Sequence, residues 1–295
     1  MKTSIRPLKF LLLICTSTLL YQCGSAKKIV QQENDEWFSL FNGKDIDNWT
    51  TKIHHYEVGD NHGETFRVED GIIKVRYDQY EGEFNARFGH LYYNQPYSYY
   101  HLVIEYRFVG ELHQGAPSYT LKNSGVMFHS QDPKTMLKEQ DWPISVEMQF
   151  LAGIEEGKAR PTGNMCSPGT DVVYKGKIDP RHCIDSSSKT YYGDQWVRAE
   201  TIVLGDSLVT HIINGDTVLQ YTKPQIGGGV ANGYDPKIKE DGKLLKEGFI
   251  ALQSEGQPID FRIVEIKNLK GCTDPKASNY GRHFVKSDPL SCIYK

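Results

Sequence analysis

Short segments with strict alternation of apolar and polar residues constrain the fold of this chain most. In residues 145–150 (SVEMQF), Val, Met and Phe alternate with polar residues that include Glu147. Residues 123–129 (NSGVMFH) follow the same rule, with Asn123 and His129 on the polar side. Because successive side chains of a strand point to opposite faces, each segment predicts one dry face and one polar face. The polar face is either a binding surface or an ordinary solvated face, and alternation does not distinguish the two.

The rest of the chain also predicts strands rather than helices. Residues 66–75 form two apolar runs joined by Asp70-Gly71, a dipeptide typical of tight hairpins. Residues 197–221 form a meander with Gly-Asp and Asn-Gly turns. Many short strands without intervening helices predict an all-β, two-sheet antiparallel sandwich. We expect residues 153–195, rich in Gly, Ser, Thr and Pro, to form a long ordered loop, because this segment carries its own pair of cysteines.

The N-terminus predicts export. Three basic residues flank a short apolar run within residues 1–22, which describes a signal peptide and not a membrane-spanning helix. Cys23 then stands at a lipobox-like position, so we expect it to carry a lipid anchor, followed by a linker over residues 23–35. Lys27 and Lys28 favour the periplasmic side of a Gram-negative envelope over the cell surface. The alternative is a secreted chain with an incidental cysteine.

The four cysteines that follow Cys23 form two pairs, each closing a short polar loop. In an oxidising compartment, Cys166 with Cys183 and Cys272 with Cys292 predict disulfides. His182 beside Cys183 leaves a zinc site as the alternative, although no C-x-x-C spacing supports it.

Charge and composition narrow the partners. The formal net charge is −3, and loss of the basic presequence makes the mature chain more acidic, so we expect no nucleic-acid partner. Aromatic residues make up 12 % of the chain, which suits both a packed β domain and stacking on sugar rings.

A series of motifs resembles one family. It comprises FSLFNGKDIDNW (38–49), NSGVMFH (123–129), VEMQ (146–149), GDQW (193–196), HIING (211–215), and GFIALQ (248–253) with Phe261-Arg262. In this order the motifs resemble the DUF1080 family, also named for 3-keto-glycoside lyase/hydratase or 3-keto-disaccharide hydrolase activity. The resemblance implies a concanavalin A-like jelly roll over residues 36–270 with its ligand on the concave sheet. Residues 271–295 resemble a short disulfide-closed module of secreted bacterial proteins.

The resemblance also implies a chemistry. A ketone at C3 of a sugar acidifies the hydrogen on C2; a base removes it, and the glycosidic oxygen leaves C1 by β-elimination. Water then adds to the glucal, which gives net hydrolysis. Glu147 is the candidate base or metal ligand, and His129 the candidate acid/base or ligand. A divalent cation held by this pair would stabilise the enolate, and its requirement stays open.

The expected partners are a 3-keto-glucoside or glucoside and an upstream sugar 3-oxidoreductase that makes the ketone. Four side chains on the same polar face and His182, from the cysteine-paired loop over residues 153–195, are the candidate substrate ligands. The four are Asn123, Gln149, Gln253 and Glu255.

Two other classes of protein remain as alternatives. A retaining two-carboxylate glycosidase needs two acids about 5 Å apart, whereas the strand of Glu147 carries only one. A non-catalytic carbohydrate-binding module would use Trp142, Tyr191 and Tyr192 as stacking platforms. Turnover, which a sequence does not reveal, separates these alternatives from the lyase.

Overall fold

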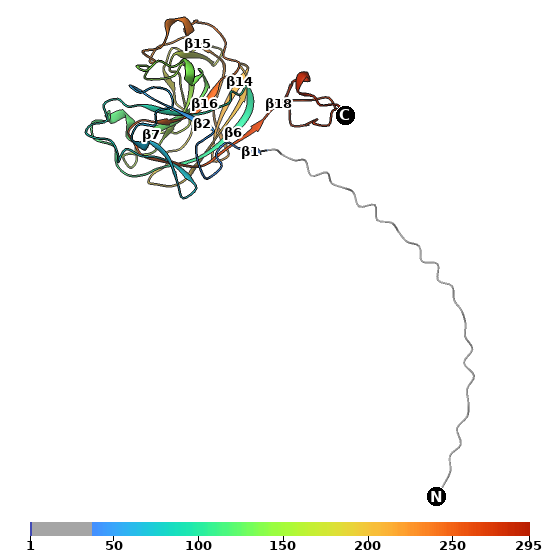
Figure 1. The fold of residues 1–295 in the computed structure, drawn as a ribbon, viewed down its shortest axis with the longest axis horizontal. Coiled ribbons are helices and arrows are strands. Elements are labelled where there is room, and N and C mark those ends of the chain that lie inside the picture. The colour runs from blue at the N-terminus through green and yellow to red at the C-terminus, as the bar shows by residue number, and fades with distance from the viewer. Residues whose placement is uncertain (2–36) are drawn as a thin grey trace. The chain divides into compact units, whose positions relative to one another are not determined.

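The computed structural model describes Met1 and residues 37–295. The predicted signal peptide, the lipidated Cys23 and the linker over residues 23–35 therefore lie outside the described residues, apart from Met1. Within the described residues, no helix is long and apolar enough to cross a membrane. The prediction of an all-β fold is confirmed, because two large antiparallel sheets form a sandwich of jelly-roll type (Figure 1).

The larger sheet has ten strands in the described part of the chain. Its order is β11-β10-β15-β14-β13-β6-β17-β4-β3, and β1 also pairs with β17. The Asp70-Gly71 hairpin is confirmed between β3 and β4, with both turn residues at positive φ. The strands are β1 (Trp37–Ser39), β3 (Phe66–Glu69), β4 (Ile72–Val75), β6 (Tyr99–Phe108), β10 (Thr170–Tyr174), β11 (Lys177–Ile178), β13 (Val197–Leu204), β14 (Leu208–Ile213), β15 (Asp216–Ile226) and β17 (Ile259–Asn268).

The second sheet has seven strands, in the order β12-β9-β8-β7-β16-β5-β2. Its inner face packs against the larger sheet: Phe150 of β8 stacks on Tyr106 of β6 with ring centroids 4.1 Å apart. Its outer face carries the polar side chains discussed below. The strands are β2 (Trp49–Ile53), β5 (Gly89–Tyr93), β7 (Asn123–Ser130), β8 (Val146–Leu151), β9 (Asn164–Cys166), β12 (Cys183–Ile184) and β16 (Phe249–Ser254).

The segment over residues 153–195 is ordered and builds sheet edges. Its strands β9 and β12 extend the seven-stranded sheet, and β10 and β11 extend the larger sheet. The predicted disulfide between Cys166 and Cys183 is confirmed, and it joins cross-strand neighbours of β9 and β12. The loop predicted from composition is therefore an extension of both sheets, held by the Cys166–Cys183 disulfide; below it is called the stapled segment.

The described 3-10 turns are η1 (His62–Glu64), η2 (Ser118–Thr120), η3 (Pro133–Thr135), η4 (Pro236–Ile238) and η5 (Pro289–Ser291).

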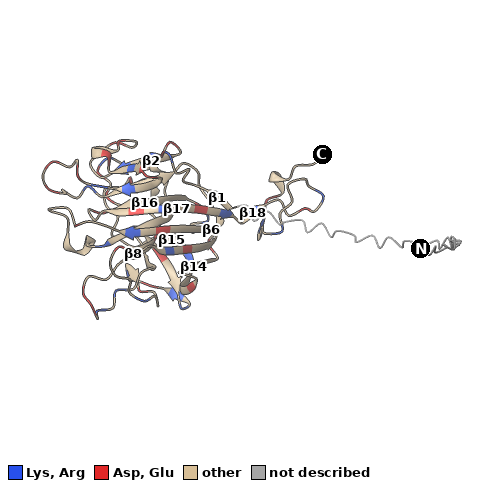
Figure 2. Ribbon diagram, turned by 90° about the horizontal axis from the view of Figure 1, so that it is seen from below, with Lys and Arg blue, Asp and Glu red and all other residues tan. Residues whose placement is uncertain are grey.

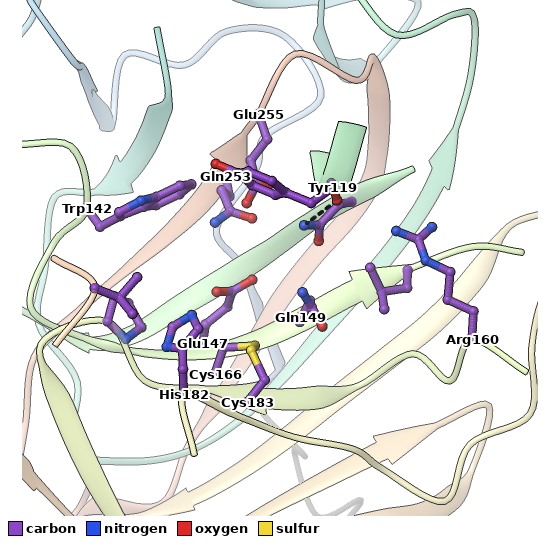
Figure 3. Close-up of a pocket in the computed structure, with 14 residues that line it drawn as sticks. Tyr119, Trp142, Glu147, Gln149, Arg160, Cys166, His182, Cys183, Gln253 and Glu255 are labelled. Carbon is purple, nitrogen blue, oxygen red and sulfur yellow. Dashed lines mark hydrogen bonds between the residues drawn. A yellow bond between two sulfur atoms is a disulfide. The ribbon is translucent and has the colours of Figure 1, made fainter. Parts of the chain in front are cut away.

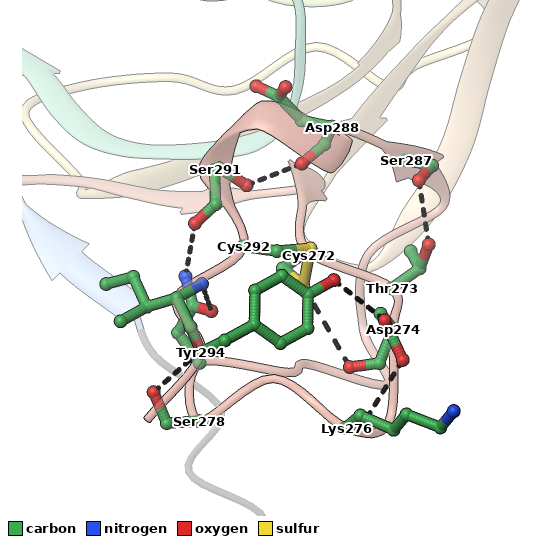
Figure 4. The surroundings of a disulfide bond; sticks show 12 residues. Cys272, Thr273, Asp274, Lys276, Ser278, Ser287, Asp288, Ser291, Cys292 and Tyr294 are labelled. Atoms are coloured by element: carbon green, nitrogen blue, oxygen red, sulfur yellow. Dashed lines mark hydrogen bonds between the residues drawn. A yellow bond between two sulfur atoms is a disulfide. The ribbon is translucent and has the colours of Figure 1, made fainter.

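The C-terminal residues form a small unit held by the second disulfide. Cys272 and Cys292 are joined as predicted, and the short strands β18 (Lys270–Gly271) and β19 (Lys286–Ser287) pair in parallel (Figure 4). The Tyr294 hydroxyl donates to the Asp274 carboxylate at 2.7 Å across the loop. Local hydrogen bonds and one disulfide thus order a segment too small to bury a core of its own.

The outer face of the larger sheet carries interspersed charges of both signs (Figure 2). Glu105 of β6 lies 2.6 Å from Arg262 of β17 and 3.7 Å from Arg198 of β13. The guanidinium groups of Arg107 and Arg262 each lie over the ring of Trp196, 4.6 and 4.4 Å from its centroid. Exposed pairs of this kind contribute about 0–1 kcal/mol each and describe a solvated face. The carboxyl and amide groups that lack hydrogen-bond partners and line a cavity lie on the other sheet.

Candidate functional site

A cavity of about 390 Å³ opens on the outer face of the seven-stranded sheet. Side chains from β7, β8 and β16 form one part of it, and the stapled segment forms another (Figure 3). Its volume falls within the range of about 300–1,000 Å³ typical of small-molecule sites. The lining residues are Tyr119, Asn123, Trp142, Glu147, Gln149, Leu151, Arg160, Cys166, Pro168, His182, Cys183, Val230, Gln253 and Glu255.

The alternation of β8 places its polar residues as the sequence predicts. Val146 and Phe150 lie in the core between the sheets, whereas Glu147 and Gln149 line the cavity. Gly125 of β7 faces Gln149 across the strand pair. A Cβ at Gly125 would lie only 2.5 Å from Oε1 of Glu147, so the missing side chain leaves the space that the Glu147 carboxyl occupies.

Two buried carboxyl groups meet in this cavity. Glu147 is 6 % exposed and Glu255 is 4 % exposed. Oε1 of Glu147 and Oε2 of Glu255 have no hydrogen-bond partner among the described residues. Burial raises the pKa of Glu147 well above its usual value, and the charge of Glu255 raises it further. Burial also raises the pKa of Glu255, to about 8, although nearby Arg160 opposes the shift.

This arrangement divides the two carboxyl groups into an acid and a base. Because the charge of Glu255 disfavours a second negative charge at Glu147, the pair retains a proton near neutral pH. The cation of Arg160 favours the ionised form of Glu255. We therefore expect Glu255 to lose its proton before Glu147, which makes Glu255 the base and Glu147 the acid of the reactive form. Two buried carboxyl groups with raised pKa values, of which one ionises before the other, can act as an acid and a base in general acid–base catalysis.

Amide groups with open hydrogen-bonding positions surround the carboxyl pair. Both amide atoms of Gln253 are buried without a partner in the described part of the chain, and so is Oδ1 of Asn123. Gln149 accepts a hydrogen bond from Asn164 at 3.0 Å, which orients its amide toward the cavity. Buried polar atoms of this kind carry a desolvation cost that a ligand rich in hydroxyl groups offsets.

The stapled segment brings His182 to the cavity, as predicted. Cys166 lies directly across from Glu147 in the β8–β9 pair, and its disulfide with Cys183 holds the strand beside His182. Burial lowers the pKa of His182, so its ring is neutral near pH 7. The three side chains Cys166, His182 and Cys183 lie within 4.8 Å of one another, but both sulfur atoms are held in the disulfide and supply no thiolate for zinc.

His129 is not part of the cavity, and the prediction that it shares the polar face is wrong. Its backbone has φ +48°, and the pairing of β16 with β7 shifts register between Phe249 and Ala251. This irregularity breaks the two-residue alternation and turns the His129 ring inward, where Nε2 lies 3.0 Å from the carbonyl oxygen of Gly205. Burial lowers the pKa of His129 to about 4.

The predicted metal pair of Glu147 and His129 is therefore not formed. The other candidates do not replace it: among the described residues, Glu147, Glu255 and His182 do not bring three ligand atoms within 4.8 Å of one another. The donor set in the cavity does not fit a preassembled metal site, so we derive the chemistry from the side chains alone.

The structure adds two lining residues with polar groups that sequence reasoning missed. Arg160 reaches the cavity from a segment without strand periodicity, and Tyr119 lies at the rim, 60 % exposed, just after the turn η2 begins. Of the three proposed stacking platforms, only Trp142 lines the cavity. Tyr191 is buried and accepts a hydrogen bond from Asn214, and Tyr192 packs against Gly153.

Comparison with known proteins assigns the chain to a family. Residues 36–267 match the profile of the 3-keto-alpha-glucoside-1,2-lyase-like domain, so the chain belongs to this family of carbohydrate-processing domains. The family predicted from the sequence motifs is thereby confirmed. No curated protein matches the chain.

Several solved structures are similar to the chain at low identity. A proposed glycosyl hydrolase from Parabacteroides distasonis is 18 % identical with TM-score 0.48, over 79 % of this chain and 100 % of that chain. A protein of unknown function with a galectin-like fold from Bacillus subtilis is 10 % identical with TM-score 0.47, over 79 % and 94 %. A carbohydrate-binding module from Bacillus subtilis is 11 % identical with TM-score 0.43, over 75 % and 96 %.

Proposed function

We propose that this protein cleaves 3-keto-glucosides by β-elimination and then hydrates the product. The observation that carries the proposal is the pair of buried carboxyl groups, Glu147 and Glu255, whose raised pKa values let one act as an acid and the other as a base. Unpaired amide groups around the pair match a polyhydroxylated substrate. Membership of the 3-keto-alpha-glucoside-1,2-lyase-like family supports the same chemistry.

In the elimination step, the carboxylate of Glu255 removes the proton from C2. The electron pair of that C–H bond forms an enolate with the C3 ketone, and the unpaired amide N–H of Gln253 is a donor available to the enolate oxygen. The C1–O bond then breaks, and the carboxylic acid of Glu147 protonates the departing glycosidic oxygen. The products are the free alcohol and a 2-hydroxyglucal that retains the ketone.

Hydration runs the same proton transfers in reverse with water as the nucleophile. The Glu147 carboxylate takes a proton from water while the oxygen of that water adds to C1, and protonated Glu255 returns a proton to C2. Both carboxyl groups regain their starting states, and the net reaction is hydrolysis. Glu147, expected from the sequence to be the base, takes the role of the acid because Arg160 favours charge on Glu255.

A two-carboxylate glycosidase is the second candidate, because the second acid that β8 lacks comes from the end of β16 as Glu255. The two functions differ in substrate. The lyase requires a ketone at C3, whereas the glycosidase cleaves the unoxidised glucoside.

The test is to incubate the protein with a 3-keto-disaccharide and separately with its parent disaccharide, following both by mass spectrometry. We expect cleavage of the ketone only. Glu147→Gln and Glu255→Gln should each lower turnover on the order of 10²–10⁴-fold. Glu247→Gln, at an exposed position before β16, is the matched control and should leave turnover unchanged. Cleavage of the parent disaccharide would support the glycosidase, and binding without turnover would support a binding module.

The substrate and the location follow from the same proposal. A sugar carrying a ketone at C3 requires an oxidoreductase that oxidises that carbon, so such an enzyme must act before this one. The lipobox-like Cys23 favours a lipoprotein, and Lys27 and Lys28 favour the periplasmic side.

A further inference from the structure

Arg160 is held in the cavity wall by the backbone around it. Its Nη1 donates to the carbonyl oxygens of Ala152 at 2.6 Å and Lys122 at 3.1 Å. Its own backbone N–H donates to Oγ1 of Thr190 at 2.7 Å. These three hydrogen bonds fix the position of the guanidinium before any ligand binds, so little side-chain entropy remains to be lost on binding.

The other guanidinium nitrogen atoms of Arg160, Nε and Nη2, have donors left for a ligand. An arginine carries five N–H donors, and the hydrogen bonds described for Arg160 in this structure use only those of Nη1. Arg160 is half-buried, and none of its nitrogen atoms is among the buried polar atoms without a partner, so Nε and Nη2 remain accessible from the cavity. Two adjacent N–H groups in one plane match the two oxygen atoms of a carboxylate.

No side chain described in the structure neutralises this cation directly. Burial lowers the pKa of Arg160 and the charge of Glu255 opposes that shift, but no ion pair or hydrogen bond joins the two side chains within the described residues. Figure 3 places Trp142 and Arg160 at opposite ends of the lining side chains, with Glu147 between them. A ligand that reaches both ends would present an apolar or ring surface to Trp142 and an anionic group to Arg160.

We propose that the substrate of this protein is an acidic glycoside, whose carboxylate Arg160 binds through Nε and Nη2. This inference rests on the proposed function and adds the chemical class of the substrate. Arg160 is then a specificity-determining residue: a neutral glycoside leaves its two open donors without a partner, and the acidic one satisfies them.

The test compares pairs of substrates in which one member carries a carboxylate and the other is neutral. One pair is the 4-carboxyphenyl 3-keto-glucoside and its methyl ester; the other is the phenyl 3-keto-glucuronide and the phenyl 3-keto-glucoside. For wild type we expect kcat/KM to be on the order of 10- to 100-fold higher for the acid of at least one pair, the effect of a charged hydrogen-bonded partner. The pair that discriminates identifies whether the carboxylate lies on the aglycone or on the sugar.

Variants of Arg160 isolate its role. Arg160→Gln should abolish the preference for the acid, and Arg160→Lys, which keeps the charge without the planar fork, should retain part of it. Arg198→Gln removes one positive charge from the larger sheet and should keep the full preference. Equal kcat/KM for the acid and its neutral counterpart in both pairs would overturn the inference while leaving the lyase in place.

Binding separates failure of this inference from failure of the proposed function. If no 3-keto-glycoside is turned over, the lyase proposal fails. Calorimetry with two unoxidised pairs then decides the inference alone: the 4-carboxyphenyl glucoside with its methyl ester, and the phenyl glucuronide with the phenyl glucoside. Tighter binding of the acid, lost in Arg160→Gln, supports an anionic ligand. Equal binding of acid and neutral compound in both pairs, or binding of none of the four, contradicts it.

Discussion

Gly125→Ala tests whether the position of the Glu147 carboxyl is essential. The new Cβ would lie 2.5 Å from Oε1, 2.9 Å from Cγ and 3.1 Å from Cδ of Glu147. To restore an ordinary contact near 3.4 Å, the carboxyl must move by about 1 Å, a displacement that can cost about 10²-fold in rate. We therefore expect turnover of a 3-keto-glucoside to fall by about that factor, although no catalytic residue is replaced.

The same substitution should leave the protein folded. Gly125 has no positive φ, so alanine fits its backbone, and overpacking of a buried site costs about 1–3 kcal/mol. Thermal unfolding monitored by circular dichroism measures this cost, and steady-state kinetics measures turnover. Gly229→Ala is the control, because a Cβ there meets no atom within 4 Å and the residue also lacks positive φ. Full activity of a folded Gly125→Ala variant would refute the role that we give to Glu147.

Three further predictions concern pH, the staple and the anchor. Because the pKa values of Glu147 and Glu255 are raised, the folded state binds more protons than the unfolded state between pH 4.5 and about 8, so stability should fall as pH rises through this window. Calorimetric Tm values should decline less steeply with pH in the Glu147→Gln/Glu255→Gln double variant, and an equal decline would contradict the raised pKa values. Replacing Cys166 and Cys183 by alanine should lower the free energy of unfolding by about 3 kcal/mol in urea titrations, and free thiols in peptide maps of the wild type would disprove the disulfide. Cys23→Ser should release the protein from membranes in cell fractionation, and unchanged membrane partition would end the lipoprotein proposal.

Much of the site follows from alternation along single strands. Glu147 and Gln149 are separated by one apolar residue, so both face the cavity, and Asn123 joins them from the neighbouring strand. Gln253 and Glu255 are also two positions apart, and the cavity includes both. These positions are predictable because the two-residue period of a strand is a local property.

The remaining features depend on contacts that a local pattern does not encode. His129 continues the alternation in sequence, but its positive φ and the register shift of β16 turn it away from the cavity. Arg160 lies between Ala159 and Pro161 in a stretch without periodicity, and its position depends on the carbonyl groups of Ala152 and Lys122. The meeting of Glu147 with Glu255 requires the order of β8, β7 and β16 in the sheet, which strand-by-strand analysis does not supply.

Exchange of hydrogen at C2 tests the central claim most directly. The enzyme would be incubated with a 3-keto-glucoside in heavy water, and the released sugar analysed by NMR and mass spectrometry. The proposed mechanism predicts one deuterium at C2 of the product, because the proton that Glu255 removes is replaced from solvent before hydration is complete. Cleavage that leaves the original hydrogen at C2 would contradict the mechanism.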